Sequence, residues 1–270
     1  MIAASLLAAL LVPAGAHATT GAPPPATVER GGDLEPPPPL SGDWRLDVHV
    51  VSHLTIPVLG TTTLLSSTAY AVRIDGPPEA PVLSQKPCTL RTSATRNIAT
   101  TTIPQAFVDA LPLKRYPLQL TPEGEGWRVR GDMRPQYIGW DPAKARAVPT
   151  SPDDAAVFDF ERDGHPGATV HLDAPVLGEI EIYIVQVAHT ILEGTWDGGS
   201  AMGGRTQVKA FQQRSIAASN RLFVQNPEVR LDNTQSTWRL VRVPAGTACA
   251  DIAQRNVGGG PALTAADFVR

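Results

Sequence analysis

A short self-match constrains this chain more than any other feature of its sequence. Residues 53–60 (HLTIPVLG) recur as residues 171–178 (HLDAPVLG), with six identities in eight positions. Both copies precede a strand-like stretch that ends in an acid–glycine pair at the same distance. Proline fixes φ and glycine permits positive φ, so the shared Pro-x-x-Gly predicts a turn that joins two strands. The unit strand, turn, long strand is therefore used twice.

Apolar and polar residues alternate through much of residues 41–243, which predicts strands with one buried face. The clearest runs are Trp44, Leu46, Val48 and Val50, and then Ile180, Ile182 and Ile184. A charged fraction of 18% and 26 prolines fit turn-rich β-structure better than a helical bundle. Two copies are too few for a solenoid. We therefore expect an all-β fold, a single antiparallel closed barrel or barrel-like sandwich with an internal pseudo-twofold repeat.

The same pattern locates the remaining elements. Further strands are expected at residues 70–74, 85–92, 97–103, 116–120, 127–131, 136–140, 155–160, 205–211 and 221–225. The alternation slips between Leu240 and Val241, which predicts a β-bulge there. Short helices are expected at residues 104–110 and 264–269.

The ends of the chain differ in composition from its middle. Residues 2–16 form an apolar run that leads into Ala16-His17-Ala18, which predicts a signal peptide over residues 1–18, cleaved after Ala18. Residues 19–40 are rich in proline and predict a disordered leader. The β domain should span residues 41–254, with repeat halves of about 41–150 and 151–254 and a tail at 255–270. We expect a secreted or periplasmic protein without a transmembrane segment.

Cys88 and Cys249 are the chain's two cysteines, and both lie in the part expected to be exported. An even count in an oxidising compartment predicts one disulfide between them. A redox-active or metal-binding pair is the alternative, although the Cys-x-x-Cys spacing typical of such pairs is missing.

Gly42-x-Trp44 begins the first expected strand, directly after the predicted leader. It resembles the Gly-x-Trp that opens lipocalin barrels, and this resemblance implies a β-barrel of the ligand-binding kind. As a whole the chain also resembles uncharacterised exported β-rich bacterial proteins, which imply no particular activity.

The motif Asp159-x-Glu161-x-Asp163-Gly164 places oxygen ligands at the first, third and fifth positions of a loop and glycine at the sixth. This spacing lets a chain wrap around a hard cation such as Ca²⁺, and Asp153 and Asp154 could add oxygens. The alternative is a plain hairpin turn built from Asp-Gly and Pro-Gly.

Three histidines offer a second possible metal site. His49 and His53 lie on one strand face, and His171 is the repeat counterpart of His53. Together they could supply zinc ligands. Alternatively, His53 and His171 hydrogen-bond the turns that follow them.

A glycine-rich stretch at residues 194–204 predicts a hairpin loop, a candidate flap over a barrel mouth. The sequence contains neither a Gly-x-Ser-x-Gly elbow nor a His-Glu-x-x-His motif, so no catalytic residue is assigned. The 23 basic residues are balanced by 26 acidic ones, which argues against nucleic acid as a partner.

We expect an exported, non-catalytic, monomeric β-barrel that binds a small apolar or amphipathic ligand at positions the sequence does not identify. A structural or interaction protein of the cell envelope, with a calcium-stiffened loop, is the alternative. An enzyme of unrecognised type is the third reading.

Overall fold

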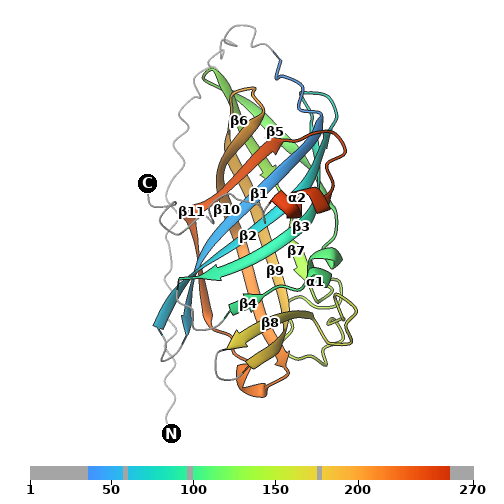
Figure 1. Ribbon diagram of the computed structural model, residues 1–270, viewed down its shortest axis with the longest axis vertical. Coiled ribbons are helices and arrows are strands. Elements are labelled where there is room, and N and C mark those ends of the chain that lie inside the picture. The colour runs from blue at the N-terminus through green and yellow to red at the C-terminus, as the bar shows by residue number, and fades with distance from the viewer. Residues whose placement is uncertain (1–35, 57–59, 96–99, 175–177, 256–270) are drawn as a thin grey trace, which may run out of the picture. The chain divides into compact units, whose positions relative to one another are not determined.

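A computed structural model describes residues 36–56, 60–95, 100–174 and 178–255, all within the unit Glu35–Arg270 (Figure 1). Most of this region is one antiparallel sheet of eleven strands, as the alternation predicted. The strands are β1 (Gly42–Ile56), β2 (Gly60–Asp75), β3 (Val82–Ala94), β4 (Thr100–Thr102), β5 (Lys114–Glu123), β6 (Gly126–Asp132), β7 (Gln136–Ile138), β8 (Ala168–Ala174), β9 (Gly178–Trp196), β10 (Ala201–Ala218) and β11 (Glu228–Arg242).

Eight of these strands form a ring. Their order is β10-β11-β1-β2-β3-β5-β6-β9, and β9 pairs with β10 to complete it. The ring is barrel-like but not closed along its whole length, because β3 and β5 share four residue pairs, from Val82 with Pro117 to Gln85 with Lys114. Outside the ring, β8 and β7 pair with β9, and β4 pairs with β8.

Both copies of the self-matching segment form hairpins with the same register. In the first, Ile56 pairs with Gly60 at the end of β1 and the start of β2; in the second, Ala174 pairs with Gly178 between β8 and β9. The unit of strand, turn and long strand is thus confirmed for the strands, whereas turn residues 57–59 and 175–177 lie outside the described part. The pseudo-twofold relation of the two halves remains a prediction.

The main core fills the end of the ring that holds the start of β1 and the end of β11, with side chains from all eight ring strands. Trp44 is fully buried, its indole N–H donates to the Leu40 carbonyl at 2.9 Å, and Leu46 is also fully buried. Buried apolar residues that pack around them are Leu40, Val48, Tyr70, Val72, Ile74, Leu83, Tyr116, Leu118, Val129, Met133, Leu192, Trp196, Met202, Trp238 and Leu240. The ring interior at this level is therefore occupied by protein.

The ladder between β10 and β11 covers five pairs, from Ala201 with Val241 to Arg205 with Thr237. Beyond it, one asparagine side chain of β11 and one from just before β11 bond to the β10 backbone. The Asn233 amide accepts from the Val208 N–H at 2.9 Å and donates to the Val208 carbonyl at 3.4 Å. Asn226 does the same with Ser215, at 2.9 and 3.5 Å. These two side chains continue the role of the ladder where the strands separate.

The predicted bulge at Leu240 and Val241 is wrong. The pairing of β11 with β1 runs unbroken from Arg242 to Thr237, and the register shifts instead between His49 and Val51 of β1. The alternation slips in the sequence because Arg242, although exposed, is in phase with buried Trp238 and Leu240, and its guanidinium lies 4.4 Å from the centroid of the Trp44 ring. A cation thus stands where the alternation would place an apolar residue, and the register of β11 with β1 does not change.

Two other predicted strands are also wrong. Residues 221–225 contain a 3₁₀ turn, η1 (Arg221–Phe223), because the Asn220 side chain accepts from the Leu222 N–H at 3.1 Å and starts a turn. Residues 155–160 form two isolated bridges, and Val157 packs on the outer cluster around Trp140. That segment reads as a strand because it covers apolar residues of the sheet.

The helices are short. The predicted helix at 104–110 is confirmed as α1 (Gln105–Ala110). A second helix, α2 (Cys249–Arg255), was not predicted, and the expected helix at 264–269 lies outside the described residues. Neither helix is long and apolar enough to cross a membrane.

Candidate functional site: a lateral cleft beside the disulfide

A cleft of about 770 Å³ lies where β3 parts from β5. Its walls come from four elements, β3, β4, α1 and α2. The lining residues are Thr89, Leu90, Arg91, Thr92, Thr100, Thr101, Thr102, Ile103, Gln105, Val108, Ala253 and Gln254. This cleft thus lies beside the ring core and not within it.

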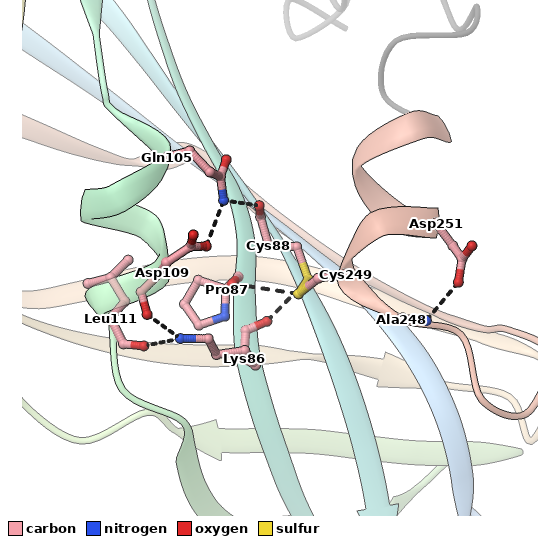
Figure 2. The surroundings of a disulfide bond; sticks show 9 residues. All are labelled: Lys86, Pro87, Cys88, Gln105, Asp109, Leu111, Ala248, Cys249 and Asp251. Carbon is pink, nitrogen blue, oxygen red and sulfur yellow. Dashed lines mark hydrogen bonds between the residues drawn. A yellow bond between two sulfur atoms is a disulfide. The ribbon is translucent and has the colours of Figure 1, made fainter. Parts of the chain in front are cut away.

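Helix α1 forms one wall and is fixed at both ends to the middle of β3. Lys86 Nζ donates to the carbonyls of Asp109 (2.8 Å) and Leu111 (2.5 Å) at the helix C-terminus, as Figure 2 shows. A cation at this end also complements the helix dipole. At the other end, the Gln105 amide donates to the Cys88 carbonyl at 3.4 Å. These bonds set the position of the helix relative to β3.

Helix α2 forms the opposite wall and is held by a covalent bond. Cys88 and Cys249 form a disulfide across 161 sequence positions, with their Cα atoms 4.9 Å apart (Figure 2). The predicted disulfide is therefore present. Ile252, on the same helix, is 1% exposed and packs with Ala69 and Cys88. The disulfide and this contact keep α2 against β2 and β3.

The cleft combines an apolar part with hydroxyl groups and one charge. Leu90 and Ile103 pack against a second buried cluster, and Val108 is 1% exposed. Five threonines stand beside them, one of which, Thr92, donates its hydroxyl to the Thr101 carbonyl at 3.1 Å. This arrangement suits a ligand with an apolar body and a polar head.

The predicted calcium ligands turn toward their own backbone. Asp159 accepts from the N–H groups of Asp163 (3.0 Å) and Gly164 (2.8 Å). Asp163 accepts from the His165 N–H at 2.9 Å, and Glu161 accepts from the Thr169 N–H. The carboxylates stabilise a turn, and the calcium site stays a prediction.

Two further acidic residues of the predicted calcium site are Glu161 and Asp153. Burial raises the pKa of Glu161, and the neighbouring Asp163 charge adds to that effect. Asp153 belongs to a separate turn in which its N–H donates to the Ser151 hydroxyl. Among the residues that the structure describes, no three histidine, cysteine, aspartate or glutamate side chains come together as a possible metal site.

The three histidines considered for zinc each contact a residue of their own hairpin. A ring nitrogen of His49 lies 2.9 Å from the Ser67 hydroxyl, and one of His53 lies 3.1 Å from the Thr63 hydroxyl. His171 pairs with Glu179 on the neighbouring strand β9. The structure does not bring them together, and burial lowers the pKa of His49.

A group of titratable side chains lies at the last β3–β5 pair. Lys114 Nζ donates to the carbonyls of Met133 and Arg134, both at 3.1 Å, and burial lowers the pKa of Lys114 to about 8. Burial works to raise the pKa of Asp132, but hydrogen bonds, led by that of His189 at 2.8 Å, outweigh it and lower the pKa. These contacts secure the chain reversal after β6, where Arg134 has a φ of 58°.

The glycine-rich stretch connects β9 and β10 as a hairpin, as predicted. Its glycines allow a close approach of the two strands, because a Cβ on Gly204 would lie 2.2 Å from the Glu193 carbonyl oxygen. A shallower groove of about 590 Å³ runs over Gly203 and Gly204. The expected role as a flap stays a prediction.

Sequence reasoning missed every residue of the lateral cleft. The visible signal was the run Thr100-Thr101-Thr102 next to Ile103, where hydroxyls and an aliphatic side chain share one short segment. Its partners on β3 and α2 are remote in sequence, so the run alone could not indicate a site.

No family model matches this chain, and no curated protein matches it. Among solved structures, a match was found with DynF from the dynemicin biosynthesis pathway of Micromonospora chersina. The two chains are 10% identical with a TM-score of 0.33, and the match covers 80% of this chain and 88% of DynF. A likeness of this size establishes neither a shared fold nor a shared activity.

Proposed function

We propose that this protein binds a small amphipathic ligand in the lateral cleft, without chemical conversion. One observation carries the proposal: a cleft of about 770 Å³ whose lining joins Leu90, Ile103 and Val108 to a set of threonine hydroxyls. Its volume lies within the range of about 300–1,000 Å³ that is usual for small-molecule sites.

The filled core moves the expected site away from the ring axis. The main core contains three tryptophans that are each at most 3% exposed: Trp44, Trp196 and Trp238. A ligand inside this part of the ring would have to displace them. The cleft needs no such displacement. We therefore place the ligand at the side of the barrel and not on its axis.

The disulfide supports export as part of this proposal. Disulfides persist in secreted and periplasmic proteins and are rare where thiols are kept reduced. Cys88 and Cys249 hold one wall of the cleft, so the site depends on an oxidising surrounding. We therefore place the binding function outside the cytoplasm.

A cleft-filling substitution tests the proposal. Thr101→Trp places a large side chain in the lining of the cleft, and saturable binding of the neutral probe N-phenyl-1-naphthylamine, followed by fluorescence, should weaken by at least about tenfold. Thr121→Trp is the matched control, because Thr121 is an exposed residue on β5 outside the cleft.

Both variants should keep the wild-type urea unfolding midpoint within error, which shows that the comparison concerns the site. If the wild-type protein shows no saturable binding of the probe, or if Thr101→Trp binds it as well as Thr121→Trp does, the proposal is wrong.

A structural role in the cell envelope is the second candidate, and the filled ring favours it. A protein with that role has no need of a ligand cavity, and it often presents apolar side chains to a partner. Leu222 on η1 is 77% exposed and Leu113 is 63% exposed. If the probe does not bind saturably, the structural role becomes the better supported of the two functions.

A further inference from the structure

Among the described residues that line the lateral cleft, Arg91 is the one that carries a charge. It lies on β3, and it is exposed. Within the described residues, its guanidinium has no carboxylate partner at ion-pair distance, in contrast to Arg45 with Asp47 (2.8 Å). The cleft thus presents an uncompensated positive charge.

Helix α1, which forms one wall of the cleft, carries the acidic residue Asp109. Asp109 lies on α1 outside the lining, and its carboxylate accepts from the Gln105 amide at 2.9 Å. Among the described residues that line the cleft there is no aspartate or glutamate. A ligand with a negative head would therefore meet attraction from Arg91 without opposition from a lining carboxylate.

We propose that the ligand is an amphipathic carboxylate. Its carboxylate pairs with the guanidinium of Arg91, which matches a planar oxyanion with two parallel N–H donors. Its hydrocarbon part lies against Leu90, Ile103 and Val108, and threonine hydroxyls at the boundary donate to the head. This inference rests on the proposed function, since it names the class of ligand for the same cleft.

The geometry also sets the size of the effect. Arg91 is exposed, so water and salt screen its charge, and the ion pair should favour the anion modestly. Most of the affinity should come from the apolar part of the ligand, which leaves water on binding. Head-group preference and chain affinity are consequently separable in an experiment.

The test compares two ligands with the same ten-carbon chain, decanoate and decanol, as competitors of the bound N-phenyl-1-naphthylamine. On the full chain at low salt, decanoate should displace the probe at about fivefold lower concentration than decanol. In Arg91→Gln, the two concentrations should become equal, because decanoate loses its partner while decanol does not. In Arg115→Gln, which removes an exposed charge on β5 instead, the preference should persist.

The outcomes separate this inference from the proposed function. If wild-type protein releases the probe equally to both ligands, or if Arg91→Gln keeps the preference for decanoate, the carboxylate inference is wrong and the binding function stands. If neither ligand displaces the probe and the probe itself does not bind saturably, the proposed function fails. A preference that narrows as salt is raised supports the ion pair.

Discussion

The two halves of β3 lie in different surroundings. From Val82 to Gln85 the strand pairs with β5, and its inward side chains Leu83 and Gln85 are each 1% exposed. From Thr89 to Thr92 it has no ladder to β5 and lines the cleft. One strand thus passes from a filled ring to an open site, and the change coincides with the end of a backbone ladder.

The comparison teaches that pairing, more than composition, decides where this fold is hollow. Where β3 and β5 pair, facing strands bring side chains to packing distance and the interior fills. β5 begins at Lys114, so beyond that pair the wall is completed by α1 and by β4, which pairs with β8 and not with β3. Helices that rest on a sheet leave gaps at their edges, and the cleft is such a gap.

The largest expected effect breaks the filled side. Trp44→Ala should lower the free energy of unfolding by about 3–5 kcal/mol, because it leaves a cavity among well-packed side chains and removes the bond to the Leu40 carbonyl. Thr101→Ala, in the cleft, should change it by less than about 0.5 kcal/mol. Urea unfolding measures both, and losses of equal size would show that the two regions do not differ in packing as described.

An intermediate effect is expected from the disulfide, which serves the cleft side. The double variant Cys88→Ala with Cys249→Ala should lose about 2–5 kcal/mol of unfolding free energy, through greater freedom of the unfolded chain. It should also bind N-phenyl-1-naphthylamine more weakly, because α2 loses its anchor. Wild-type protein under reducing conditions, in which the same disulfide is broken, is the comparison. Full-strength binding by the double variant would show that α2 is not a wall of the site.

The smallest effect concerns the boundary itself, where Lys114 pairs with Gln85. Burial lowers the pKa of Lys114 from its ordinary value of 10.5 to about 8. Between these values the unfolded chain binds a proton that the folded protein has released, so the free energy of unfolding should rise with pH. Burial raises the pKa of Tyr70 to about 12, and above about pH 10 this tyrosine acts in the opposite direction.

The window for the measurement is therefore pH 8 to 10. Urea unfolding across it should show the rise for wild-type protein and for Lys209→Met, whose lysine is exposed on β10. Lys114→Met should lack the rise, whatever its stability at neutral pH. A slope that survives in Lys114→Met would assign the titration to another group.

The sequence predicted those parts of the fold that depend on local patterns. Alternation predicted β1 and β9, Pro-x-x-Gly predicted two strand connections, and the cysteine count predicted the disulfide. It failed where a tertiary contact changes the meaning of a residue. Arg242 breaks the alternation because it lies over Trp44, and no local pattern carries that information.

The site was harder to predict for the same reason. Its residues belong to segments that meet through the disulfide and through Lys86, whose amine caps α1 from the neighbouring strand. The acid-rich motif at Asp159 and Asp163 was the more visible signal, but its carboxylates are used by backbone N–H groups. A conspicuous motif can thus serve only its own turn, while the cleft proposed as a binding site is assembled from residues that form no motif.

The bond between Cys88 and Cys249 also affects what a break in the chain would do. The bond spans 161 positions, which include the exposed turn η1 and its Leu222. A protease that cut this turn would separate β11 and α2 from the preceding strands in sequence only. The C-terminal fragment would stay attached through Cys249, and β11 would keep its pairing with β1. The molecule is built so that a nicked chain remains one covalent body.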